Sequence, residues 1–175
     1  MAKLIMGVGI PGAGKTSFLK PFAEKNAYTY ICPDDIRAEI SGNTLSQTVN
    51  KEAWAEAHRR VTEAFSKGEN VVFDATFAKD FERKDFIEFA RREGAKKVQG
   101  VFMATPLSVA LRRNDMRDRS VPEYAIERMH RQLKDSTPIV EDGFDSVFDL
   151  NEFQELKRAE MQGEEKVLTK EFKPR

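Results

Sequence analysis

Residues 9–16 have the sequence GIPGAGKT, which matches the pattern G-x-x-x-x-G-K-[ST] in full. An apolar run at residues 4–8 precedes this loop, and a helical stretch at residues 15–24 follows it. The glycines allow backbone angles that other residues resist, so that successive N–H groups turn inward and form an anion nest. The helix adds the partial positive charge of its N-terminus. The segment therefore predicts a buried strand, a phosphate-binding loop and a helix.

This loop predicts ATP and Mg²⁺ as ligands. In such a motif Lys15 reaches the β- and γ-phosphates, and the Thr16 hydroxyl is placed to bind Mg²⁺. A chance glycine turn is the alternative, but the match is complete and the flanking elements fit. The loop residues expected to bind the phosphates are Gly9, Gly12, Ala13, Gly14, Lys15, Thr16 and Ser17. The motif alone does not choose among hydrolases, switches and kinases.

Short β-type runs alternate with helical stretches along the rest of the chain. Further strands are expected at residues 28–32, 70–73, 98–103 and 146–150, and helices at residues 34–40, 51–67, 81–92, 107–118 and 122–135. The alternation predicts an α/β fold, a three-layer sandwich of the P-loop NTPase or kinase type with a parallel sheet. We expect residues 1–150 to form the kinase-like domain. The charged residues 151–175 should extend the same domain and include a helix.

Composition restricts the partners of this chain. Its 175 residues include 29 Lys+Arg and 29 Asp+Glu, so the formal net charge is zero. A protein that holds long nucleic acid mainly by charge is more basic, so any nucleic-acid contact should involve a short single-stranded segment. Cys32 is the only cysteine, which excludes an internal disulfide and favours a cytoplasmic location. No apolar run approaches the roughly 18 residues needed to cross a membrane, so no membrane partner is expected.

Acidic residues follow two of the predicted strands. In the sequence DDIR, residues 34–37, Asp34 and Arg37 share one face of a helix. A carboxylate there accepts a proton from an acceptor hydroxyl, and an arginine clamps an acceptor phosphate. Asp74 ends the next strand, where an acidic residue supports Mg²⁺ or orients the acceptor. The alternatives are a carboxylate that favours the helix N-terminus, for Asp34, and a turn cap, for Asp74.

The segment RRNDMRDRS, residues 112–120, is strongly basic. Four arginines in eight residues, at a helix end and in a loop, predict an arginine-rich lid over the transferring phosphoryl group. Arg117 is the first candidate for contact with that group, and Arg113 is the second. The alternative is a solvated face on which Asp115 and Asp118 pair with the arginines.

The order GIPGAGKT, DDIR, VVFDAT and RRNDMRDRSVP resembles the P-loop 5′-hydroxyl polynucleotide kinase family, with the bacteriophage-type kinase domain closest, over about residues 3–150. The resemblance implies transfer of the γ-phosphate of ATP to a 5′-hydroxyl of DNA or RNA, in nucleic acid repair. It implies that Asp34 is the general base and that Arg117 touches the donor phosphates. The catalytic residues would be Lys15, Asp34, Arg37, Asp74 and Arg117. The acceptor would contact Asp34, Arg37, Asp74, Thr76 and Val121.

Two other functions stay open at this point. The same scaffold could phosphorylate another hydroxyl, on aminoacylated tRNA, a nucleoside or a small metabolite. It could also be a nucleotide-binding switch that hydrolyses ATP only slowly. The oligomeric state is not indicated by the sequence.

Overall fold

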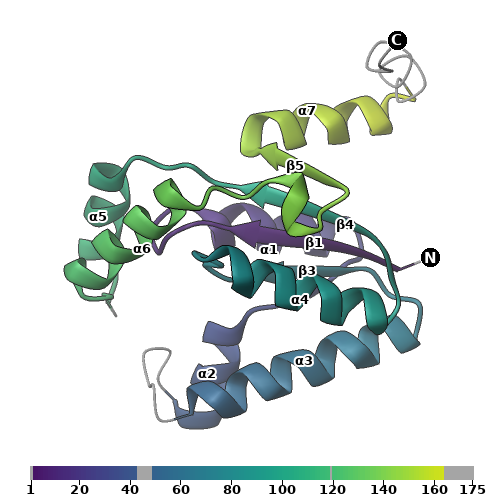
Figure 1. Ribbon diagram of the computed structural model, residues 1–175, viewed down its shortest axis with the longest axis horizontal. Helices are drawn as coiled ribbons and strands as arrows, with labels where there is room; N and C mark the ends of the chain where they lie inside the picture. Colours follow the sequence, from purple (N-terminus) through teal and green to yellow (C-terminus); the bar gives the residue numbers. More distant parts are fainter. Residues whose placement is uncertain (1, 43–48, 119, 164–175) are drawn as a thin grey trace.

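A parallel sheet forms the centre of the computed structural model, which describes residues 2–42, 49–118 and 120–163 (Figure 1). Its strands are β1 (Ala2–Val8), β2 (Thr29–Ile31), β3 (Val71–Asp74), β4 (Ala95–Phe102) and β5 (Ser146–Asp149). They are ordered β2-β3-β1-β4-β5, and every neighbouring pair is parallel. The predicted α/β fold with a parallel sheet is thus confirmed.

The continuous apolar sequence of the central strand, β1, is explained by its burial. Its side chains Leu4, Ile5 and Met6 are fully buried, because helices cover both faces of the sheet. In the register of the sheet, Gly7 of β1 lies beside Asp74 of β3, and Val8 lies beside Phe102 of β4. The three strands therefore end at the same edge, and the segments that follow them meet there.

Helices pack on both faces of the sheet (Figure 1). On one face lie α1 (Lys15–Lys25) and α7 (Leu150–Met161), joined by Phe153, whose ring centroid is 5.3 Å from that of Phe22. On the other face lie α3 (Asn50–Ser66) and α4 (Asp80–Arg92), where Trp54 packs 5.7 Å from Phe73. Within the described ranges, no helix combines the length and the apolar character that crossing a membrane requires.

The remaining elements are α2 (Pro33–Ser41), α5 (Leu107–Asp115), α6 (Glu123–Asp135) and the short 3₁₀ helix η1 (Val140–Asp142). The first three lie near the edge where the strands end, and the fourth, η1, packs against α4 before β5 begins. The helix expected at residues 107–118 stops at Asp115, because the Asn114 side chain binds the backbone of Val121 and turns the chain back. The helix expected after residue 150 is α7. Residues 164–175, residues 43–48 and Arg119 lie outside the described residues.

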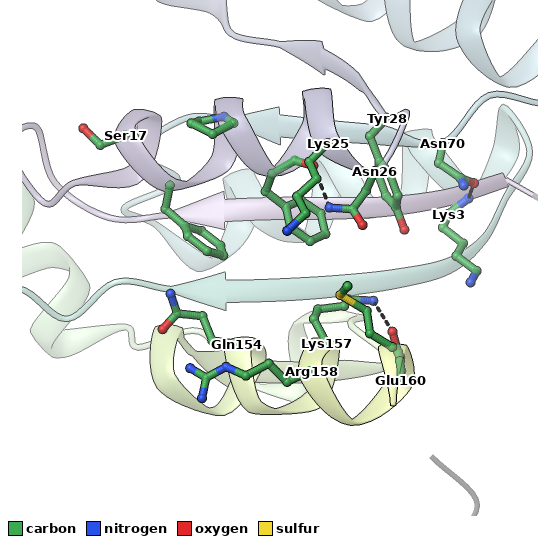
Figure 2. Close-up of a pocket in the computed structure, with 14 residues that line it drawn as sticks. Lys3, Ser17, Lys25, Asn26, Tyr28, Asn70, Gln154, Lys157, Arg158 and Glu160 are labelled. Atoms are coloured by element: carbon green, nitrogen blue, oxygen red, sulfur yellow. Dashed lines mark hydrogen bonds and ion pairs between the residues drawn. The ribbon is translucent and has the colours of Figure 1, made fainter. Parts of the chain in front are cut away.

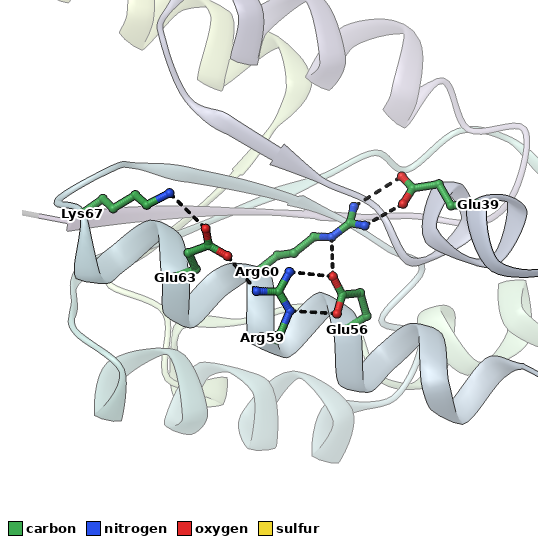
Figure 3. Close-up of polar contacts among 6 residues, drawn as sticks. All are labelled: Glu39, Glu56, Arg59, Arg60, Glu63 and Lys67. Carbon is green, nitrogen blue, oxygen red and sulfur yellow. Dashed lines mark hydrogen bonds and ion pairs between the residues drawn. The ribbon is translucent and has the colours of Figure 1, made fainter.

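Ion pairs fasten α2 to α3 (Figure 3). Arg60 of α3 lies 2.6 Å from Glu39 of α2 and 3.0 Å from Glu56. We call this set the α2–α3 ion-pair network; its members are Glu39, Glu56, Arg59, Arg60, Glu63 and Lys67. A second tie is the hydrogen bond of 2.5 Å from Arg37 to the Asn50 side chain. The position of α2, which carries Asp34, is thus set by α3.

We expect Glu56→Gln to make the stability of the protein less sensitive to acid. Hydrogen bonds from Arg59, and then from Arg60, lower the pKa of Glu56 from 4.5 to about 2. A carboxylate with a lowered pKa stabilises the folded state above its unfolded pKa and loses that contribution as the pH falls through the folded pKa. Between these two pKa values, the melting temperature of the wild type should therefore fall more steeply than that of the variant.

Thermal melts followed by circular dichroism across this pH range measure the difference in slope. Glu52→Gln is the matched control, because Glu52 is an exposed glutamate on α3 outside the network. Parallel curves for the wild type and Glu56→Gln would contradict the expectation.

Candidate active site

The phosphate-binding loop is held in shape by its own glycines and by α5. Gly12 and Gly14 have φ angles of +83° and +94°, the left-handed region that favours glycine. An added Cβ at Gly12 would overlap the carbonyl of Ala110 in α5. The Thr105 hydroxyl donates to the Ala13 carbonyl at 2.8 Å, and Arg113 donates to the Gly12 carbonyl at 3.2 Å. The loop is therefore preorganised before any phosphate binds.

Lys15 lies in the first turn of α1, where the loop joins the helix. Its ammonium group donates to the Ile10 carbonyl at 3.3 Å, which holds the amine over the loop. Burial lowers the pKa of Lys15, and the carboxylate of Asp74 opposes that shift. An anionic phosphate placed beside this amine would favour its charged form in the same way. The site thus carries a cation that lacks full hydration and suits an anionic ligand.

Two hydroxyl groups converge on one carboxylate oxygen of Asp74. Thr16 donates to Asp74 Oδ2 at 2.9 Å, and Tyr30 donates to the same oxygen at 2.5 Å. Asp74 is buried, at 2% exposure. Burial, and then the charge of Asp74, raise the pKa of Tyr30, so this phenol stays protonated and remains a donor. Tyr30 was not among the residues expected from the sequence, since a tyrosine in a three-residue strand carries no motif.

The donor set around Asp74 is compatible with Mg²⁺. Mg²⁺ prefers oxygen ligands and keeps several waters, so one or two protein oxygens beside substrate phosphates are sufficient. The Thr16 hydroxyl and the Asp74 carboxylate supply such oxygens. Across the described ranges, no three side chains of His, Cys, Asp and Glu gather into a cluster of metal-binding type. These residues would hold the metal together with the phosphates of ATP.

A cavity of about 280 Å³ lies at the edge of the sheet where the strands end. It joins the phosphate loop to the segments after β2 and β3 and to the segment after α5. The expected site residues that line it are Lys15, Thr16, Asp34, Asp74, Thr76, Arg117 and Val121. Its other lining residues are Pro11, Cys32, Pro33, Asp35 and Ala75. The cavity thus brings donor-side and acceptor-side candidates of the sequence into one space.

The pair expected after the second strand is split by the structure. Asp34 lies in the first turn of α2 and lines the cavity, with its side chain 63% exposed. Arg37 is 14% exposed, forms an ion pair with Asp34, and also binds Asn50. In the part of the chain that is described, the cavity lining does not include Arg37. Arg37 therefore contacts Asp34 through an ion pair without lining the cavity itself. Its contact with an acceptor phosphate stays a prediction.

Cys32 is the residue just before α2. It is 8% exposed and lines the cavity. Burial, and then the charge of Asp74, raise the pKa of its thiol to about 12. Because a protonated thiol is a poor nucleophile, Cys32 contributes volume and not covalent chemistry to the site.

The arginine-rich segment divides between α5 and the turn after it. Arg113, in the last turn of α5, contacts the phosphate loop through Gly12. Asn114 is buried and exchanges two hydrogen bonds with the Val121 backbone, at 2.7 and 2.9 Å. This clamp, which sequence reasoning missed, closes the turn that carries Arg117 to the cavity. Motion of a lid stays a prediction.

Ser17 lies away from the cavity. With Phe18 and Phe22 it lines a second pocket of about 550 Å³ between α1 and α7. Figure 2 shows that Ser17 is at one end of this pocket, while Lys3 and Asn70 are at the other. The predicted contact between Ser17 and the nucleotide stays a prediction.

The family model described as an AAA domain matches residues 4–136 of the chain. The chain belongs to this family. It is a P-loop kinase, and its relatives and its fold agree on that class. The family implies ATP as the ligand of the loop, and typically Mg²⁺.

Two curated relatives are named as kinases of nucleic-acid substrates. One, from Acanthamoeba polyphaga mimivirus, is named as a bifunctional polynucleotide phosphatase/kinase and is 29% identical over 115 residues, or 66% of this chain. The other is the L-seryl-tRNA(Sec) kinase of Methanococcus maripaludis, 29% identical over 139 residues, or 74% of this chain. The P-loop kinase spans 24% of the first relative and 52% of the second.

Among solved structures, the Pnkp1/Rnl/Hen1 RNA repair complex contains a chain with the same fold. The superposition gives a TM-score of 0.70 with 23% identity, over 82% of this chain and 46% of that one. At this identity the likeness establishes the fold of the kinase and leaves its acceptor open.

Proposed function

We propose that this P-loop kinase transfers the γ-phosphoryl group of ATP to the 5′-hydroxyl end of a DNA or RNA strand. The observation that carries the proposal is the shared cavity, which is lined by Asp34 and also by Lys15, Thr16 and Arg117. A hydroxyl acceptor needs a base on one side and cationic groups around the phosphoryl group on the other. The names of the mimivirus relative and of the RNA repair complex support a polynucleotide as the acceptor.

The residues that line the cavity have different roles in the proposed reaction. Asp34 accepts the proton of the 5′-hydroxyl, whose oxygen bonds to the γ-phosphorus of ATP while the bond to the β–γ bridging oxygen breaks and ADP leaves. Lys15 and Arg117, which line the same cavity, stabilise the charge on the equatorial oxygens. Thr16 and Asp74 would hold Mg²⁺, which would supply further neutralisation of phosphate charge when bound.

The acceptor strand should be held over a short length only. The cavity is small, and the chain has no net charge with which to hold a long strand. Asp74 and Thr76 would limit the position of the acceptor on the β3 side, and Val121 would supply an apolar contact.

The single buried cysteine fits a reducing environment, and we propose a cytoplasmic location for the protein.

The alternative candidate for the acceptor is aminoacylated tRNA, which the name of the Methanococcus relative supports. The seryl hydroxyl and the 5′-hydroxyl of a nucleotide are both primary alcohols, so the same base and the same cations serve both. The two acceptors differ in what surrounds the alcohol, and only transfer to each one separates them.

With labelled γ-phosphate and Mg²⁺, we expect the protein to label a short 5′-hydroxyl oligonucleotide. The same oligonucleotide with a 5′-phosphate is the control, because it keeps every other hydroxyl and lacks the acceptor. Gel electrophoresis of DNA and RNA versions measures the transfer. Label on seryl-tRNA with none on either 5′-hydroxyl strand would replace the proposal by the second acceptor.

A further inference from the structure

Arg83 of α4 is the largest side chain that the fold buries completely. Its guanidinium group pairs with Asp142 at 2.7 Å, and the Asp142 side chain is itself only 2% exposed. A buried charge is unfavourable unless it is paired and its remaining donors are satisfied. Replacing such pairs by apolar residues is often neutral for stability, so a buried pair is by itself weak evidence for a role in stability.

The remaining donors of Arg83 bind backbone at two distant places. Nη1 donates to the Phe77 carbonyl at 2.8 Å, and Nη2 donates to the Ser136 carbonyl at 2.8 Å and to its hydroxyl at 3.1 Å. Asp142 also accepts from the Ile139 backbone at 3.2 Å. One planar guanidinium therefore joins the start of α4, the end of α6 and η1.

The first of these places is the turn that forms one wall of the cavity. Phe77 follows directly on Asp74, Ala75 and Thr76, which line the cavity. Its φ of +46° is unusual for a bulky residue and persists only where the surroundings hold it. The Thr76 carbonyl in turn accepts from the Gly9 backbone at 3.2 Å, so the same turn reaches the phosphate loop.

The second place is the far end of the helix that begins beside Val121. Ser136 caps the C-terminus of α6, and Pro122 caps its N-terminus. Val121, which precedes Pro122, lines the cavity and is clamped by Asn114. Arg83 therefore ties the turn at residues 74–77, which lines the cavity, to the C-terminal end of α6, the helix whose N-terminal end follows Val121.

We propose that Arg83 is a positioning residue for phosphoryl transfer. It touches no cavity atom; it holds the Asp74–Phe77 turn against α6 and so fixes where the acceptor lies relative to Lys15 and Arg117. The acceptor assay rests on the function proposed above, whereas the placement of the turn does not. A displacement of about 1 Å in such a site lowers rates by about 100-fold.

Two variants separate positioning from stability. Arg83→Lys keeps the charge but lacks the planar fork that reaches Asp142, Phe77 and Ser136 together. The double variant Arg83→Met with Asp142→Leu replaces the pair by apolar groups, which restores packing without restoring the bond to Phe77. Arg91→Lys is the matched control, because Arg91 lies on the same helix and donates to the Gly143 carbonyl at 2.7 Å near the surface.

For both Arg83 variants we expect kcat/KM for the acceptor to fall by about 10- to 100-fold, with a smaller change in the KM for ATP. The chain has one tryptophan, and Trp54 packs edge-on against Phe77 with ring centroids 6.0 Å apart. Its fluorescence therefore reports the turn without any acceptor, and we expect it to change in both variants but not in Arg91→Lys.

The outcomes separate the two proposals. If the wild type transfers nothing to 5′-hydroxyl strands but Trp54 emission responds to the Arg83 variants, the acceptor is wrong, and the placement of the turn by Arg83 stands. If both folded variants keep wild-type emission and acceptor kcat/KM, the positioning role is overturned. It is likewise overturned if the double variant recovers the wild-type melting temperature and wild-type transfer together.

Discussion

Asp34→Asn should lower phosphoryl transfer by about 100- to 10,000-fold while leaving ATP binding intact. The amide keeps the size of the side chain and cannot accept the proton of the acceptor hydroxyl at neutral pH. The Asp34 side chain is 63% exposed, so its ion pair with Arg37 contributes about 0–1 kcal/mol and the fold should be unaffected. Single-turnover transfer and binding of a fluorescent ATP analogue measure the two effects.

Asp85→Asn is the matched control for this change. Asp85 is an exposed aspartate on α4, and the same replacement there should alter neither transfer nor ATP binding. Because Asp34 also pairs with Arg37, the variant Arg37→Lys tests whether the loss arises through a displaced arginine. Transfer by Asp34→Asn at the wild-type rate would show that Asp34 is not the base.

Gly12→Ala should weaken ATP binding by at least about tenfold, and it should destabilise the fold. At φ +83° an alanine costs roughly 1–2 kcal/mol in backbone strain. Its Cβ would also overlap the Ala110 carbonyl, which is backbone of α5 and cannot rotate away. Overlap of this kind costs about 1–3 kcal/mol more, or displaces the loop from the geometry that suits phosphate.

Gly68→Ala isolates the strain from the overlap. Gly68 also has a positive φ, +74°, but an added Cβ there meets nothing within 4 Å. The Gly68→Ala variant should be destabilised only by the backbone strain, and its ATP affinity should equal that of the wild type. Denaturant melts and ATP titrations compare the two variants, and equal affinity losses for both would remove the special role of Gly12.

Much of the fold follows from local patterns in the sequence. The continuous apolar run before the glycine loop predicts β1, because a strand covered on both faces has no polar side. The loop predicts the start of α1 at Lys15, where the structure has it. Helix ends are harder to predict: α5 stops at Asp115 because a side chain reaches residue 121, and no local pattern shows that contact.

Residues of the candidate site could be predicted from the sequence where they belong to a recognisable motif. Residues whose interaction partner is distant in the sequence were missed. Lys15, Asp34 and Asp74 each end a strand or begin a helix at the edge where parallel strands finish, so their meeting follows from topology. Arg83 sits in a charged stretch, ERKD, that suits an exposed helix face. Its partner Asp142 is 59 residues away, so only the tertiary fold identifies the pair.

The strand order places the two halves of the reaction on two halves of the sheet. The segment after β2 carries Asp34 and the end of β3 carries Asp74, whereas the segments after β1 and β4 carry the phosphate loop and the arginine-rich segment. Of the proposed acceptor contacts, Asp34, Asp74 and Thr76 lie on the β2–β3 flank of the central strand, and Val121 lies on the β4 flank. A segment grafted between β2 and β3 in place of residues 32–70 would change the surroundings of Asp34 and leave the phosphate loop, Asp74 and the arginine-rich segment in place.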